Sequence, residues 1–126
     1  MSGHEGLVFS VAYSPDGKTL ASSGEYGTLR LWNPSSGKAR IFKGHEGWIV
    51  SVVFSPDGSQ LATAVHDGTV RLWDVGGNEP RVFTGHDGSV HDVAFSPDGL
   101  TLASGGEDGT VKLWNVGAGT DSSDWY

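Results

Sequence analysis

Apolar and polar positions follow one another along this chain in a pattern that favours β-strands over helices. Residues 48–54 are mostly apolar and β-branched without helical spacing, which predicts a largely buried strand. Residues 60–65 form a second apolar run, and residues 69–73 alternate as a third strand. Residues 80–84 predict a short fourth strand, whose leading proline suits the edge of a sheet. Pro-Asp-Gly and Asp-Gly turns separate the first three runs, so we expect an antiparallel sheet.

The same pattern occurs three times at a constant spacing. The tetrapeptide Ser-Pro-Asp-Gly begins at Ser14, Ser55 and Ser96, so successive copies lie 41 residues apart. Two further pairs keep this step, namely Gly3-His4, Gly44-His45 and Gly85-His86, and Leu31-Trp32, Leu72-Trp73 and Leu113-Trp114. A fixed period of about 40–45 residues indicates a repeat architecture. We therefore divide residues 1–126 into units 3–43, 44–84 and 85–119, followed by an atypical tail at 120–126.

One such sheet cannot fold alone, because its strands carry apolar residues on both faces. Stacked copies of the sheet would cover one another. A single β-sandwich is the alternative, but sandwiches rarely carry a strict repeat, so we favour the stacked arrangement.

These motifs resemble the WD-repeat family of β-propellers, in which each blade has four strands and a Gly-His to Trp-Asp signature. The resemblance covers residues 3–116, and the segment Asp-Gly-Thr-Val-Arg-Leu-Trp-Asp at 67–74 carries it most completely. The closing pair is Trp-Asn at Trp32 and at Trp114, a common departure. The resemblance implies an all-β fold of three four-stranded antiparallel blades of a WD-repeat β-propeller, within a single partial-propeller domain.

The resemblance also implies a hydrogen-bonded network that locks each blade. It joins the His of Gly-His, a Ser or Thr of the second strand, the Asp of the Asp-Gly turn and the Trp of the third strand. The corresponding residues are His4, Ser22 and Trp32, then His45, Thr63, Asp67 and Trp73, and finally His86, Ser104, Asp108 and Trp114. Tyr26 stands where the first Asp would be, so we expect a weaker first lock. Such sets resemble hydrolase triads, but they recur inside every sheet, which favours a structural role and no catalytic residues.

Composition narrows the range of partners. Eight Lys and Arg against fifteen Asp and Glu give a net charge of −7, which disfavours nucleic acid. The absence of cysteine excludes disulfides and thiolate metal sites. No apolar run is long enough for a bilayer, and the N-terminus lacks signal-peptide features. We expect no cofactor, no membrane partner and, by default, a cytoplasmic location.

Three blades are fewer than the 4–8 that usually close a propeller. The arc would leave two different apolar faces uncovered, and a head-to-tail contact between such faces can close a ring. We therefore expect homo-oligomerisation, with a six-bladed dimer favoured over a nine-bladed trimer. A segment of a longer propeller and a recently duplicated or designed building block are also compatible with the constant spacing.

The tail departs from the repeat at the expected fourth strand of the third blade. Ser123 and Asp124 stand where Ile41 and Phe42 stand in the first blade. Either this outer strand is absent, or a slip of one residue lets Trp125 replace Phe42.

Variable positions at one end of the blades are candidates for recognition, because the loop before the first strand and the turn after the second open on the same end. These positions are Leu7, Phe9, Glu25, Tyr26, Trp48, Val50, His66, Ser89, His91, Asp92 and Glu107. Trp48 is the strongest candidate, because Leu7 and Ser89 at the equivalent positions show that the blade needs no large ring there.

A non-enzymatic protein–protein interaction scaffold, completed by self-association, is the function that the sequence favours. A building block without a ligand is the first alternative. An enzyme or metal site built from His66, His91, Asp92 and Glu107 at the channel mouth is the second, although no metal-binding spacing supports it.

Overall fold

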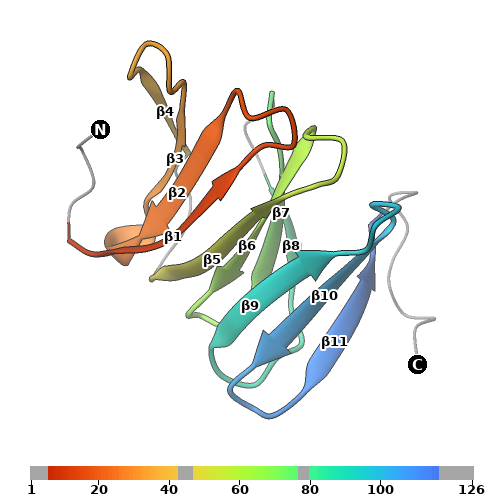
Figure 1. Cartoon of the computed structure of the whole chain (residues 1–126). Coiled ribbons are helices and arrows are strands. Elements are labelled where there is room, and N and C mark those ends of the chain that lie inside the picture. Colours follow the sequence, from red (N-terminus) through yellow and green to blue (C-terminus); the bar gives the residue numbers. More distant parts are fainter. Residues whose placement is uncertain (1–5, 43–46, 77–79, 117–126) are drawn as a thin grey trace.

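A computed structural model describes residues 6–42, 47–76 and 80–116 of the chain, with Tyr26 described by its backbone alone. Three antiparallel sheets make up this part (Figure 1). The first contains β1 (Val8–Tyr13), β2 (Leu20–Gly24), β3 (Leu29–Trp32) and β4 (Ala39–Phe42), with a 3-10 turn, η1 (Glu25–Gly27), between β2 and β3. The second contains β5 (Ile49–Phe54), β6 (Gln60–Val65), β7 (Val70–Asp74) and β8 (Arg81–Phe83). The third contains β9 (Val90–Phe95), β10 (Thr101–Gly106) and β11 (Val111–Asn115).

The all-β architecture of antiparallel sheets is thus confirmed. Within each sheet, every strand pairs with the next one along the chain, because short turns join consecutive strands. The fourth strand expected in the third sheet would involve residues 120–126, which lie outside the described residues. No helix among the described residues is long and apolar enough to cross a membrane.

The three sheets share one register. Trp32 lies opposite Leu20, Trp73 opposite Leu61, and Trp114 opposite Leu102. Each first strand also has an irregularity at the same place, where one residue has no partner on the second strand. The unpaired residues are Phe9, Val50 and His91. These β-bulges end the regular alternation of side chains near the start of the strand.

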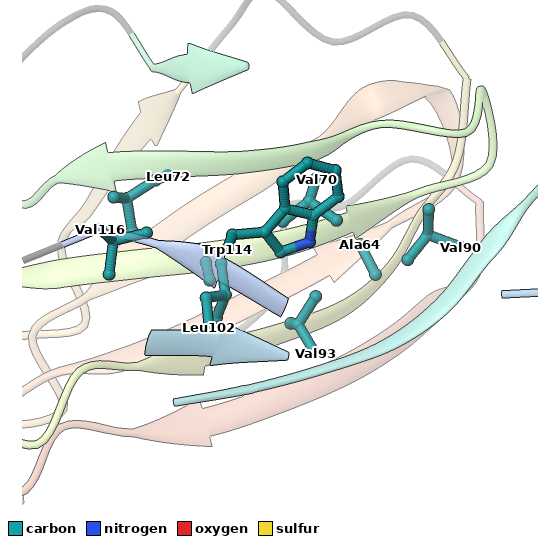
Figure 2. Packing of buried hydrophobic residues seen from close by; sticks show 9 residues of the cluster. Ala64, Val70, Leu72, Val90, Val93, Leu102, Trp114 and Val116 are labelled. Atoms are coloured by element: carbon teal, nitrogen blue, oxygen red, sulfur yellow. The ribbon is translucent and has the colours of Figure 1, made fainter. Parts of the chain in front are cut away.

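The core lies between the sheets, and the first strands β1, β5 and β9 lie next to one another in sequence order (Figure 1). Between the first two sheets, Leu29 and Phe42 pack with Ile49, Val52 and Trp73. The Phe42 and Trp73 rings stack with centroids 5.3 Å apart. The apolar cluster between the second and third sheets is shown in Figure 2 and contains Ala62, Ala64, Val70, Leu72, Val90, Val93, Leu102, Trp114 and Val116.

Polar contacts between neighbouring sheets repeat with the same period. Arg40 Nη1 donates to the Val75 carbonyl at 2.6 Å, and Arg81 Nη1 donates to the Val116 carbonyl at 3.4 Å. Donors and acceptors are each 41 positions apart. The third sheet is therefore placed on the second much as the second is placed on the first.

Candidate functional site

The lock of the third sheet is complete within the described residues. His86 Nε2 lies 2.7 Å from Ser104 Oγ, and Trp114 Nε1 donates to the same oxygen at 2.9 Å. His86 Nδ1 lies 3.3 Å from Asp108 Oδ1, and the His86 side chain is fully buried. Because a carboxylate only accepts, Nδ1 donates to Asp108, and a neutral ring then accepts the Ser104 hydroxyl at Nε2. The buried network satisfies each of these polar groups.

Asp108 is held as an anion by its other partners. The Thr110 hydroxyl donates to Oδ1 at 2.7 Å, and the backbone N–H of Asp87 donates to Oδ2 at 3.0 Å. These two hydrogen bonds, the hydroxyl first, hold the pKa of Asp108 well below its usual range. Ser104 is buried and already engaged by both His86 and Trp114, so the arrangement holds the sheet together and offers no reachable nucleophile.

The other two locks are described in part. Trp32 Nε1 donates to Ser22 Oγ at 2.8 Å, and Trp73 Nε1 donates to Thr63 Oγ1 at 3.4 Å. Asp67 forms an ion pair with Arg71 at 3.3 Å. The predicted partners His4 and His45 lie outside the described residues.

The first sheet differs where Tyr26 replaces the turn Asp. The 3-10 turn η1 stands there, and the Thr28 hydroxyl donates to the Glu25 carbonyl at 3.0 Å. In the second and third sheets, the equivalent Thr69 and Thr110 hydroxyls donate to the turn carboxylates at 2.6 and 2.7 Å. The first sheet thus uses a backbone acceptor where the others use a charged one.

Three exposed rings form what we call the aromatic patch, made of Phe9, Trp48 and His66. The Phe9 and Trp48 centroids are 5.4 Å apart, and Trp48 and His66 stack at 5.6 Å. Phe9 is the bulged residue of β1, and the His66 N–H donates to the Trp48 carbonyl at 2.8 Å. The Trp48 side chain stays 43% exposed in spite of both neighbours. The patch therefore offers a preformed aromatic surface that spans the first two sheets.

Two acidic residues lie on elements that adjoin the aromatic patch. Glu25 accepts a hydrogen bond from the Leu7 N–H at 2.7 Å, and its turn η1 lies against β5. On the other side, Asp92 accepts from the Ser51 hydroxyl at 3.1 Å, which links the first strands of the second and third sheets. Both carboxylates therefore lie near the end of the sheets that carries the rings.

The remaining candidates of this end do not form one cluster. His91 Nε2 lies 3.9 Å from Glu107 Oε2, and both side chains are exposed. Ser89 is buried, and its carbonyl accepts from the Glu107 N–H at 2.9 Å, so this serine does not reach the surface. Leu7 is exposed and Val50 is half-buried. Among the described residues, no group of three His, Cys, Asp or Glu is arranged to hold a metal ion.

The two outer sheets each present an uncovered apolar face. Val11 is 62% exposed, whereas Val52 and Val93 at the equivalent positions are 2% and 3% exposed. On the opposite face of the third sheet, Val111 is 74% exposed, whereas its equivalent Val70 is fully buried. We call these the front face, on the first sheet, and the back face, on the third sheet.

The hydrogen bonds from Arg40 and Arg81 that join neighbouring sheets were not predicted from the sequence. The signal was present, because both arginines keep the 41-residue step, but nothing in the sequence identifies a backbone carbonyl as the acceptor. The hydrogen bond from Ser51 to Asp92, which stand at equivalent positions of their sheets, was not predicted either.

Comparison with known proteins gives one consistent result. The family model described as "WD domain, G-beta repeat" matches residues 1–33, 37–74 and 77–115. Among curated proteins, the chain is 49% identical over 39 residues to the periodic tryptophan protein 2 homolog of Dictyostelium discoideum. It is 53% identical over 36 residues to the serine-threonine kinase receptor-associated protein of Gallus gallus, and 50% identical over 38 residues to the small ribosomal subunit protein RACK1y of Oryza sativa subsp. japonica.

These matches are short relative to the proteins concerned. They cover 31%, 29% and 30% of this chain, but 4%, 10% and 11% of those three proteins in the same order. The chain thus spans a small part of the length of each relative.

Proposed function

Because this chain belongs to the WD domain, G-beta repeat family, we propose that it is a non-enzymatic protein-interaction scaffold completed by self-association. The front face of one copy would receive the back face of the next. The observation that carries the proposal is the exposure of Val11, whose two equivalents are buried by a neighbouring sheet. An exposed apolar face of this kind favours association.

The contact between copies would continue the contacts inside one copy. In the core, Val70 and Leu72 of one sheet pack with Val90 and Val93 of the next. Val111 and Leu113 stand at the positions of Val70 and Leu72, while Val8 and Val11 stand at those of Val90 and Val93. The two uncovered faces therefore carry apolar side chains at the positions that an internal interface uses.

Ring size follows from how often this contact is repeated. The two faces differ, so the contact is head-to-tail and closes a ring only when the rotations add up to a full turn. Two copies give six blades, within the usual range of 4–8, and three copies give nine. We propose the dimer.

Sedimentation equilibrium of the chain tests this proposal. A dimer would have about twice the 13.2 kDa mass of one chain. Val11→Lys places an unpaired charge in the contact, which should cost about 3 kcal/mol and weaken association roughly a hundredfold.

Leu100→Lys is the matched control. Leu100 is 53% exposed, and a lysine, Lys18, already stands at its position in the first sheet. This variant should keep the mass of the parent chain. A parent chain that stays monomeric at about 100 µM contradicts self-association, as does equal weakening by both lysine variants.

The aromatic patch is the surface that we propose for recognition of a protein partner. Aromatic side chains, Trp above all, dominate the binding energy of protein interfaces. Because Glu25 and Asp92 lie on elements that adjoin the patch and the chain carries a net charge of −7, the occupant would be a positively charged peptide segment. An arginine of that segment can stack on Trp48 through its planar guanidinium group.

Fluorescence anisotropy with a labelled peptide of alternating arginine and glycine tests the patch. Trp48→Ala should weaken binding about tenfold, the loss expected for a truncated aromatic anchor. Leu100→Ser, which removes an exposed apolar side chain from a β-turn at the other end, should leave it unchanged. Equal effects of the two variants, or equal binding of a glutamate peptide, would refute the assignment.

A further inference from the structure

A surface groove of about 390 Å³ lies at the end of the first sheet opposite the aromatic patch. Residues of the connections from β1 to β2 and from β3 to β4 line it, and both connections lie at the same end of the first sheet (Figure 1). We call it the cationic groove. It is lined by Lys18, Thr19, Leu31, Trp32, Asn33, Lys38, Ala39, Arg40 and Val75.

The groove is positively charged, whereas the chain as a whole is negatively charged. Three of the eight Lys and Arg residues line it, in a chain with a net charge of −7. No Asp or Glu is among its described lining residues. Asp16 lies near Lys18 and offsets part of its charge, but it is a single carboxylate beside the three cations that line the groove. The groove therefore favours an anion.

The polar groups of the groove are mainly donors. Arg40 is fixed at its mouth, since Nη1 donates to the Val75 carbonyl and the guanidinium carbon lies 4.6 Å from the Phe42 ring centre. A guanidinium held in this way needs little further ordering to bind an oxyanion. Asn33 Oδ1 accepts from the Ser35 N–H at 2.9 Å, so its amide N–H groups are the part of that side chain that can donate to a ligand.

The two lysines are not required by the blade. The positions equivalent to Lys18 carry Ser59 and Leu100, and those equivalent to Lys38 carry Glu79 and Thr120. Neither lysine forms an ion pair with a carboxylate among the described residues. A structural role in the repeat therefore does not explain this pair of charges.

A second groove, of about 340 Å³, lies between the second and third sheets and is lined by Asp57 and Asp98 and by no lysine or arginine. It lies at the Ser-Pro-Asp-Gly turns, so it is not the counterpart of the cationic groove. At the positions equivalent to the cationic groove, the second sheet keeps Arg81 but carries Ser59 and Glu79 in place of the two lysines. The two lysines are thus particular to the first sheet.

We infer that the cationic groove binds a small molecule that carries a phosphate group beside an apolar portion. Lys18, Lys38 and Arg40 would surround the phosphate, which accepts several charged hydrogen bonds at once. Leu31, Trp32 and Val75 would contact the apolar portion. The volume lies within the roughly 300–1,000 Å³ of small-molecule sites. This site lies at the first and second sheets of one copy, so it is independent of the proposed self-association.

Phenyl phosphate is the probe, with inorganic phosphate and phenol as its two halves. In backbone amide NMR spectra, phenyl phosphate should shift signals of residues 18–19, 31–33 and 38–40, with a dissociation constant on the order of 1–5 mM. Inorganic phosphate should bind several-fold more weakly, and phenol should cause no shifts there. The double variant Lys18→Ser/Lys38→Ser should weaken phenyl phosphate about fivefold, as expected for two solvent-exposed charges.

Lys112→Ser is the control, because it removes one positive charge in the third sheet. It should change binding by less than either single lysine variant of the groove. Equal weakening by Lys38→Ser and Lys112→Ser would mean that only the net charge of the chain matters, and it would refute the proposed site. Phosphate binding as tight as that of phenyl phosphate would overturn the apolar contribution, and with it the ligand class. Because Lys18 and Lys38 are exposed, the double variant should melt as the parent chain does.

Discussion

Replacing Ser104 with alanine removes the oxygen that joins two buried side chains. Ser104 Oγ receives the Trp114 indole N–H at 2.9 Å and lies 2.7 Å from His86 Nε2. Both partners stay in place when the oxygen is lost, and water cannot reach them easily, since the His86 side chain is fully buried and Trp114 is buried. The variant therefore leaves two polar groups without their partner.

The expected cost follows from these two hydrogen bonds. Each net bond contributes about 0.5–1.5 kcal/mol, and an unsatisfied buried group costs roughly 1–3 kcal/mol. We expect Ser104→Ala to lower the free energy of unfolding by about 2–4 kcal/mol. For a domain of this size, that corresponds to a fall in melting temperature of about 10 °C.

Urea denaturation followed by tryptophan fluorescence measures the loss. Ser104→Thr keeps the hydroxyl, and Thr63 stands at this position in the second sheet, so that variant should retain most of the stability. Ser35→Ala, at an exposed position, sets the background. The reasoning fails if Ser104→Ala costs no more than Ser35→Ala, or if Ser104→Thr costs as much as Ser104→Ala. The same midpoint should be measured at several protein concentrations, because association would add to apparent stability.

Three further predictions concern the turns. Gly106→Ala should destabilise the chain by about 1–3 kcal/mol, because a Cβ there would lie 2.6 Å from His86 Nδ1; a melting temperature within 1 °C of the parent would contradict this. Tyr26→Asp should stabilise it by about 1–2 kcal/mol, by supplying the carboxylate that the first turn lacks, and an unchanged or lowered melting temperature would count against the predicted lock. The hydrogen bond from the Ser59 N–H, followed by those from the nearby Ser55 and Ser59 hydroxyls, lowers the pKa of Asp57 from 3.8 to about 2. The contribution of ionised Asp57 to the free energy of unfolding is therefore complete above about pH 4 and is lost as the pH falls toward 2. Asp57→Asn should reduce the dependence of the free energy of unfolding on pH in this range, and an unchanged slope would refute this role of Asp57.

The strands could be predicted because local pattern and packing agree in this chain. Gln60–Val65 was expected as a strand with the same bounds that the structure gives β6. The repeated Leu and Trp residues also have a physical reason, because Leu61 lies opposite Trp73, and the equivalent pairs recur in the other sheets. The repeat also strengthens the prediction, because each weak local preference for a strand or a turn occurs three times in the sequence.

The structure at the end of the sheets that carries the variable candidate positions could not be predicted in the same way. Residues 49–54 are almost all apolar, so alternation cannot reveal that Val50 has no partner across the strand. This bulge arises from pairing with β6, and the equivalent bulges of the other two sheets leave Phe9 and His91 unpaired. Ser89 was a candidate for recognition because it varies, but packing buries it. Variation identifies positions that the blade leaves free, whereas exposure depends on the neighbouring sheet.

The cationic groove was missed for a related reason. Lys18 lies in the connection after β1, whereas Lys38 immediately precedes β4 and Arg40 is its second residue. Only the antiparallel arrangement of the four strands brings these connections to one end of the sheet. The sequence signal is the contrast with the equivalent positions, where Ser59 and Glu79 remove both charges.

Self-association would change how the aromatic patch is used. In a two-copy ring with head-to-tail contacts, the symmetry axis runs along the ring axis, so both patches face the same end. A partner with two positively charged segments can then bind both, and the second binding event becomes intramolecular. Avidity of this kind exceeds the single-site affinity by about 10²–10⁴-fold when the linker spans the sites. A tandem arginine peptide should therefore lose this gain with Val11→Lys, although that substitution leaves Trp48 intact. A gain that persists in monomeric Val11→Lys would mean that recognition does not depend on the ring.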